Sequence, residues 1–380
     1  MTKVIVFLVC ALTFNSLASQ VIYETIASSK LGESREIKIQ LPRGYDPESN
    51  ILYPLIVVMD GDYMFEPIIG NVDYHSYWGD MPKSIVVGIN QSETRESDLS
   101  YSDETYFPSN EGSQFYEFIG MELIPYMNDK YLTSEFRIIV GHDLSANFLN
   151  FYLFKDKPLF RGYIAFSPDI SPEMNNRLGE RLPTLEEETF YYLATGDNDV
   201  SSLKQDILKL NATFAGIENP KLNYRFDNFE DADHYSLVGL GIPKAINEIF
   251  GLYKPINRKE YDEKMLTFEE GPYEYLMKKY EDIEFFYGFE KKVVENDIRA
   301  VAAAARKTGN LDAMKDLSRL ADKEYSESMI SAYYAGLYYE MDGNLKKALQ
   351  NYQSGLLLEE SQFINKDMLL DKIYDIQDKN

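Results

Sequence analysis

The chain has 380 residues, of which 38 are Lys or Arg and 62 are Asp or Glu, and its formal net charge is −24. This length suits one large domain and a smaller one, and the 30 Tyr and 22 Phe side chains exclude an intrinsically disordered protein. An acidic chain without a Lys/Arg stripe repels phosphate backbones, which excludes nucleic acid as a partner.

Residues 1–19 have the pattern of a secretory signal peptide. Lys3 precedes an apolar run from Val4 to Phe14, and the segment ends in small residues suited to cleavage. The run is shorter than the roughly 20 residues that a membrane span needs, and no later stretch is long and apolar enough to anchor the chain. Cys10, the sole cysteine, lies in this segment. We therefore expect an exported protein, periplasmic or extracellular, whose mature form has no disulfide, no reactive thiol and no membrane span.

Residues 20–255 are predicted to form an α/β domain. Ile37, Ile39 and Leu41 alternate with polar residues, as in a half-buried strand. Between Phe115 and Met127, apolar residues recur every three or four positions, as on the buried side of a helix. Near-continuous apolar runs alternate with such helical stretches, which is typical of a doubly wound, mainly parallel sheet covered on both faces. These runs are residues 55–59, 84–89, 137–140, 162–166 and 191–194.

Residues 256–380 are predicted to be helical, because strand patterns end near Pro255 and helical periodicity follows. The motif Gly309-Asn310-Leu311 returns 34 residues later as Gly343-Asn344-Leu345, and 34 is the period of tetratricopeptide repeats. The second copy resembles that family, and an ordinary helical bundle with a chance match is the alternative. Two repeats bury too little surface to stand alone, so we expect this region to pack on the α/β domain or on a protein partner. The small and large residues that carry the resemblance are Gly336, Tyr339, Gly343, Ala348, Tyr352 and Gly355.

Three positions carry the candidate chemistry. Residues 141–145, Gly-His-Asp-Leu-Ser, follow a predicted strand and lead into a helix, which is the pattern of a nucleophile elbow. Asp197 and Asp199 follow a later strand, and His234 comes last. Because ligands of open α/β sheets bind outside the carboxyl ends of the strands, we expect these side chains to meet at that edge. The chain order of elbow, acid and histidine is that of α/β-hydrolases.

From about Leu31 to Leu252 the sequence resembles the bacterial putative-esterase family, which includes siderophore and feruloyl esterases. The resemblance implies that Asp143 stands at the nucleophile position, that His234 is the general base, and that Asp199, or else Asp197, orients it. It further implies an oxyanion hole made by the backbone N–H groups of Asp62 and Leu144, and a small ester or other small molecule in the cleft. We expect no cofactor, and no metal because no spacing of the three histidines favours metal binding. The matching segments are residues 31–35, 41–45, 53–55, 59–65, 87–90, 95–99, 122–126 and 233–234. In one of them, Arg95 and Asp98 are expected to form a structural pair near the cleft.

The elbow departs from the family pattern Gly-x-Ser-x-Gly at two positions, since Asp143 replaces the serine and Ser145 replaces the last glycine. A carboxylate that attacks an ester gives an anhydride, a poor intermediate, whereas carboxylates act well on saturated carbon. The loss of both elbow residues favours a catalytically silent relative that binds through the cleft and the helical region. The retained His234 and acid loop keep two alternatives open. One is a hydrolase of carboxylic esters in which Asp143 acts as a general base, and the other uses Asp143 as a nucleophile on saturated carbon.

Overall fold

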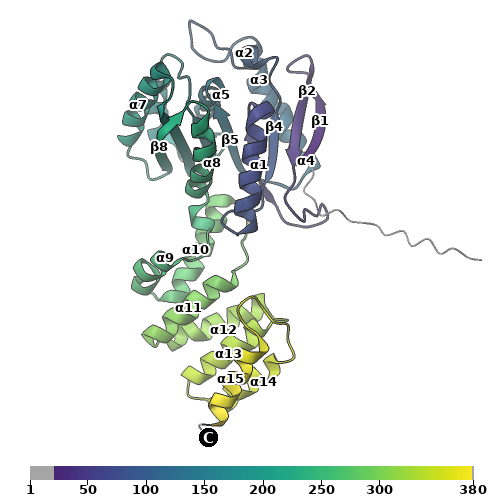
Figure 1. The fold of residues 1–380 in the computed structure, drawn as a ribbon, viewed down its shortest axis with the longest axis vertical. Helices are drawn as coiled ribbons and strands as arrows, with labels where there is room; N and C mark the ends of the chain where they lie inside the picture. Colours follow the sequence, from purple (N-terminus) through teal and green to yellow (C-terminus); the bar gives the residue numbers. More distant parts are fainter. Residues whose placement is uncertain (1–20, 379–380) are drawn as a thin grey trace, which may run out of the picture.

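The structure, a computed structural model, describes residues 21–378. The predicted signal peptide lies outside the described residues. An α/β part comes first and a helical part follows it (Figure 1). The strands are β1 Val21–Ala27, β2 Ser34–Gln40, β3 Tyr53–Val58, β4 Ile85–Ile89, β5 Thr133–His142, β6 Gly162–Phe166, β7 Thr189–Asn198 and β8 Leu222–Asp233. The helices of the α/β part are α1 Gly61–Tyr77, α2 Arg95–Asp98, α3 Glu111–Phe118, α4 Ile124–Lys130, α5 Leu144–Phe148, α6 Met174–Arg181, α7 Ser201–Ala215 and α8 Ser236–Ile249.

The strands form one eight-stranded sheet in the order β1-β2-β4-β3-β5-β6-β7-β8. Strands β1 and β2 are antiparallel to each other, and β2 is antiparallel to β4. The strands from β4 to β8 in this order are all parallel. The predicted doubly wound, mainly parallel sheet is therefore confirmed, and the carboxyl ends of its parallel strands share one edge.

Both faces of the sheet are buried, which explains the near-continuous apolar runs of its central strands. In β3, Leu55 and Val57 pack under the helices of one face, whereas Ile56 and Val58 pack under the other. The first face is covered by α3, α4, α6 and α7, and the second by α1 and α8. A π-helical turn, Ile119–Leu123, joins α3 to α4, so the stretch predicted as one helix is a continuous helical segment.

The helical part consists of consecutive helices that pack on their neighbours in the chain. The repeated Gly-Asn-Leu motif forms the turn within each of two helical hairpins. Gly309 and Gly343 adopt the left-handed conformation, with φ of 69° and 78°, and the following asparagine caps the next helix by accepting a backbone N–H. The helices are α9 Arg258–Glu263, α10 Pro272–Tyr287, α11 Glu295–Thr308, α12 Leu311–Glu324, α13 Met329–Met341, α14 Leu345–Gly355 and α15 Lys366–Gln377.

Helix α10 attaches the helical part to the sheet. The ring of Tyr287 packs edge-on against Phe136 and stacks on Phe190, and its hydroxyl donates to the carbonyl of Ile249 at 2.8 Å. Phe136 and Phe190 lie near the amino ends of β5 and β7, so the helices extend from the edge opposite the carboxyl ends (Figure 1). Helices α10 to α15 therefore continue away from the predicted cleft. Within residues 21–378, no helix has the length and apolar character that crossing a membrane requires.

Candidate active site

The elbow has the sharp strand–turn–helix geometry that the sequence predicts. Strand β5 ends at His142, Asp143 adopts φ 60° and ψ −122°, and α5 begins at Leu144. A Cβ added to Gly141 would lie 2.6 Å from the carbonyl carbon of Ser145, so any side chain here would force the helix away from the strand where it crosses back. The backbone N–H of Asp143 donates to the carbonyl of Phe166 at 3.0 Å. This turn presents the Asp143 side chain at the carboxyl edge of the sheet, where it is partly exposed.

The Asp143 carboxylate is bound by a guanidinium group. Arg95 Nη1 lies 3.2 Å from Asp143 Oδ2. The same guanidinium donates to Asp60 through Nε at 2.6 Å and Nη2 at 3.1 Å, and Nη2 also donates to the carbonyl of His142 at 3.0 Å. Burial alone would lower the pKa of Arg95, but the bonds and charge of Asp60 outweigh it and raise the pKa. Arg95 is therefore a fixed cation shared between two carboxylates.

Ser145 and Tyr63 complete the surroundings of Asp60. The buried hydroxyl of Ser145 donates to Asp60 Oδ2 at 2.6 Å and accepts from the backbone N–H of His142 at 2.8 Å. Tyr63 donates to the same oxygen of Asp60 at 3.1 Å and lies 3.0 Å from His142 Nδ1. Asp60 is itself 1% exposed, so its charge is compensated by these donors rather than by water.

Asp199 and His234 are hydrogen-bonded to each other. His234 Nδ1 donates to Asp199 Oδ1 at 2.9 Å, and the Ser167 hydroxyl lies 3.0 Å from the same nitrogen. The Thr195 hydroxyl and the Val200 N–H also donate to Asp199, at 2.7 and 2.8 Å. Burial would raise the pKa of Asp199, but these hydrogen bonds hold it well below its usual range. The bond to Asp199 raises the pKa of His234 despite partial burial.

The two histidines of the site are in contact, but their pKa values are shifted in opposite directions. The ring centroids of His142 and His234 are 4.4 Å apart, and His142 Nε2 lies 2.9 Å from the His234 carbonyl oxygen. Burial first, and then the charge of His234, lower the pKa of His142. The charge of Asp143 contributes to the raised pKa of His234. Across residues 21–378, however, no hydrogen bond joins Asp143 to His234.

The other residues named from the sequence lie around this group. Asp197 is exposed and bonds to Lys204 and Asn228, not to His234, so Asp199 is the carboxylate that the fold brings to the histidine. Asp62 uses its side chain to accept the backbone N–H groups of residues 91 and 92. The backbone N–H groups of Asp62 and Leu144 both belong to the first turn of a helix, where such groups have no partner within the helix. Their role as an oxyanion hole stays a prediction.

Sequence reasoning missed the partner of Asp143. Arg95 and Asp98 were expected to pair with each other, and this is wrong. Asp98 pairs with buried Arg35, through Nη1 at 2.5 Å and Nη2 at 3.0 Å, while Arg95 pairs with Asp60 and Asp143. Each residue finds a more buried partner from another segment. The described part of the chain contains no group of three or more His, Cys, Asp or Glu side chains placed to hold a metal ion.

The fold, the elbow and the order of acid and histidine along the chain define the class of protein as an α/β-hydrolase. A family model described as "Putative esterase" matches residues 28–222, and the chain belongs to this family. Among proteins with curated descriptions, none matches the sequence.

Solved structures extend the likeness beyond the family model. A structure of an uncharacterised protein from Capnocytophaga ochracea is 30% identical, with a TM-score of 0.82, and the match covers 94% of this chain and all of that one. An IroE-like serine hydrolase from Shewanella oneidensis is 21% identical, with a TM-score of 0.61 over 79% of this chain and 98% of that one. The siderophore hydrolase EstA from Aspergillus nidulans is 15% identical, with a TM-score of 0.52 over 65% of this chain and 99% of that one. The last two likenesses concern the fold.

Proposed function

We propose that this protein is an exported member of the esterase family that does not hydrolyse carboxylic esters and instead binds ligands through its cleft and helical region. The observation that carries the proposal is the Asp143 carboxylate at the elbow, held by Arg95 Nη1 at 3.2 Å. The predicted signal peptide at residues 1–19 is the basis for export.

The charge of Asp143 opposes ester hydrolysis. Attack on an ester carbonyl develops negative charge on the carbonyl oxygen, which an active site must stabilise with hydrogen-bond donors. A carboxylate at the elbow places a second negative charge beside that oxygen. Arg95 bonds to the Asp143 carboxylate and so lowers its nucleophilicity. Because Arg95 also donates two hydrogen bonds to Asp60, few of its N–H groups remain to stabilise an oxyanion.

Ser145 does not replace the missing nucleophile. Its hydroxyl is fully buried and is engaged by Asp60 and by the backbone of His142. It also lies in α5, two residues beyond the tip of the elbow, and bonds to neither His234 nor Asp199. The carboxylate that accepts its proton is already paired with Arg95, and a hydroxyl that is fully buried cannot reach a substrate.

The intact pair of Asp199 and His234 supports the alternative, an active hydrolase. His234 has the raised pKa of a histidine that a carboxylate orients, and it could assist Asp143 in activating water or in opening an intermediate formed at saturated carbon. The bond between Asp143 and Arg95 opposes both reactions, because each needs a free carboxylate. The structure therefore favours a catalytically silent member of the family over an active hydrolase.

The helical region offers a surface for a protein partner. A groove of about 560 Å³ runs between α12, α13 and α14, and it carries both charged and aromatic side chains. Lys315, Arg319 and Asp322 supply the charges, and Tyr338 and Tyr339 supply aromatic area. This mixture of aromatic residues with Arg is typical of protein interfaces. Tetratricopeptide-like character, proposed on the 34-residue repeat, is consistent with such a groove.

Hydrolysis of a short-chain aryl ester tests the proposal. We expect the purified protein to show only the background rate and Asp143→Ser to exceed it by about tenfold or more, because serine at the elbow would meet the retained base His234. Adding His234→Ala to Asp143→Ser should return the rate to background.

Asp169→Ser is the matched control for loss of charge alone. Partial burial and the charge of Asp143 raise the pKa of Asp169, so this carboxylate shares the electrostatic environment of the elbow without lying at its tip. Asp169→Ser should leave the rate at background. Turnover by the unmodified protein that disappears in Asp143→Ala would overturn the proposal and make Asp143 a catalytic residue.

A further inference from the structure

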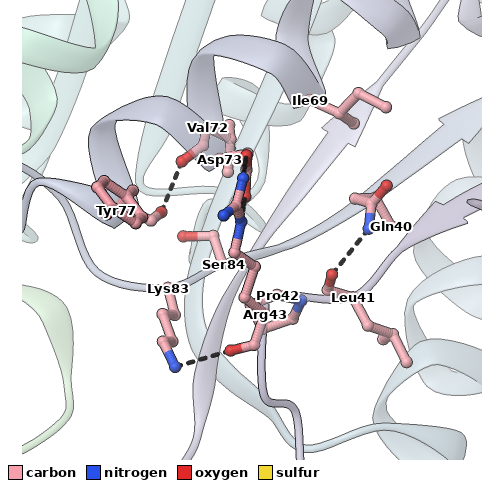
Figure 2. Close-up of a pocket in the computed structure, with 11 residues that line it drawn as sticks. Gln40, Leu41, Pro42, Arg43, Ile69, Val72, Asp73, Tyr77, Lys83 and Ser84 are labelled. Carbon is pink, nitrogen blue, oxygen red and sulfur yellow. Dashed lines mark hydrogen bonds and ion pairs between the residues drawn. The ribbon is translucent and has the colours of Figure 1, made fainter. Parts of the chain in front are cut away.

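A hollow lies at the opposite end of α1 from the candidate active site. Figure 2 shows the side chains that line it. Helix α1 begins at Gly61, beside Asp60, and ends at Tyr77, which is about 24 Å away at the rise of an α-helix. The carboxyl end of β2 reaches the same place, because β2 is antiparallel to β4 and Gln40 pairs with Val86. The hollow is therefore enclosed by the end of β2, the last turns of α1 and the segment that leads into β4.

The interior of this hollow is apolar. Leu41, Pro42, Ile69 and Val72 line a cavity of about 240 Å³. A dry apolar cavity of about 150 Å³ is large enough to bind benzene. The cavity in this protein therefore has room for a single ring with a short substituent, or for an alkyl chain of similar volume.

Charged side chains stand at the rim, and cations exceed anions. Arg43 donates to Asp73 through Nε at 2.6 Å and Nη2 at 2.5 Å, and its guanidinium carbon lies 5.5 Å from the centre of the Tyr77 ring. Lys83 Nζ donates to the backbone carbonyl of Arg43 at 2.7 Å. Among the residues that the structure describes, Lys83 has no carboxylate partner, so its charge at the rim is uncompensated.

We propose that this cavity binds a small amphipathic carboxylate, with its apolar body among Ile69 and Val72 and its carboxylate on Lys83. Asp73 occupies two of the five N–H donors of Arg43, those on Nε and Nη2. Nη1 is left as a second donor, beside Lys83, to the carboxylate of the ligand. Apolar pockets with a few convergent polar groups are the usual form of small-molecule sites. The net charge of −24 repels anions from most of the surface. An anionic ligand therefore needs both the local cations and the apolar contacts of the cavity to bind.

The sole tryptophan lies next to a residue that lines the cavity and provides a fluorescent probe for it. Trp78 follows Tyr77, its ring is 5.2 Å from the Tyr77 ring, and it is 63% exposed. Titrating the protein with 3-phenylpropanoate or octanoate should change the Trp78 fluorescence in a saturable way, and calorimetry should give the same Kd. The neutral 3-phenylpropanamide should bind about tenfold or more weakly, because it forms no ion pair with Lys83. If both acids bind, the site accepts apolar carboxylates in general. If only 3-phenylpropanoate binds, the site selects a ring, and if only octanoate binds, it selects an alkyl chain.

Variants locate the ligand. Lys83→Gln should weaken binding by about tenfold, whereas Lys157→Gln, which removes an exposed lysine that does not line the cavity, should not change the Kd. Ile69→Phe should fill the cavity and abolish binding while the circular dichroism spectrum is retained. His234→Ala should leave the Kd unchanged. The proposal is overturned if neither acid binds, if the amide binds as well as the acids, if Lys83→Gln binds normally, or if His234→Ala abolishes binding and so places the ligand in the cleft.

Discussion

Replacing Gly141 with alanine tests the elbow independently of any activity. The new Cβ would lie 2.6 Å from the carbonyl carbon and oxygen of Ser145 and 2.7 Å from the backbone nitrogen of Ala146. Ordinary van der Waals contact begins at 3.4 Å, so α5 has to move away from β5 by about 0.8 Å. The obstructing atoms are backbone atoms, so a change of rotamer cannot relieve the contact.

The expected cost follows from overpacking of a buried site. Such contacts destabilise proteins by about 1–3 kcal/mol, and alanine recovers about 0.4–1 kcal/mol by restricting the unfolded chain. We therefore expect Gly141→Ala to lower the free energy of unfolding by about 1–2 kcal/mol, which corresponds to roughly 2–8 °C in Tm for a domain of this size class. Urea and thermal unfolding followed by far-ultraviolet circular dichroism measure both quantities.

Gly239→Ala is the matched control. Gly239 lies in α8, and a Cβ at this position meets no atom within 4 Å, so alanine should leave stability unchanged or raise it by up to about 1 kcal/mol. If Gly141→Ala were as stable as Gly239→Ala, α5 would not cross β5 at the described distance. The elbow geometry, and the argument about Asp143 that depends on it, would then fail.

Two further predictions concern the charges of the site. Asp60→Asn should lower stability by about 1.5–3 kcal/mol in urea denaturation, because it removes the buried anion that fixes Arg95, and unchanged stability would refute this role. The bond to Asp199 raises the pKa of His234 above its usual 6.5, so the resulting stabilisation is fully present below about pH 6.5 and is lost as the pH rises through the folded-state pKa. The Tm difference between the unmodified protein and His234→Gln should therefore shrink from about pH 5 to about pH 9, and a difference that grows would contradict the assignment.

The sequence predicts the buried strands well and the edge strands poorly. Each predicted run overlaps an observed strand and extends past its end by no more than one residue, because strands buried on both faces must be apolar throughout. The runs are residues 55–59, 84–89, 137–140, 162–166 and 191–194. Strand β8, Leu222–Asp233, was not predicted. It is the edge strand after β7, and its half-exposed, charged sequence carries no apolar run. Only its pairing with β7 identifies it as a strand.

In the candidate site, too, the features formed by residues close in sequence could be predicted, and those formed by distant residues could not. The elbow could be predicted because a strand, a glycine and a helix start lie within a few residues of one another. The bond between Arg95 and Asp143 could not, since it joins residues 48 positions apart and depends on where α2 lies against the carboxyl edge of the sheet. Arg95 and Asp98 are close in sequence but do not pair with each other. Arg95 pairs with the Asp60 carboxylate and Asp98 with the Arg35 guanidinium, and both partners come from distant parts of the chain.

The two departures from the esterase pattern are linked through one ion pair. Asp143, which the sequence resemblance aligns with the family's serine, bonds to Arg95, and Ser145, which it aligns with the last glycine, bonds to Asp60. Arg95 and Asp60 are in turn bonded to each other by two N–H groups. This chain of contacts from Asp143 through Arg95 and Asp60 to Ser145 gives each altered side chain a hydrogen-bonded partner. Replacing Asp143 with serine should therefore release one donor of Arg95 while both bonds between Arg95 and Asp60 remain.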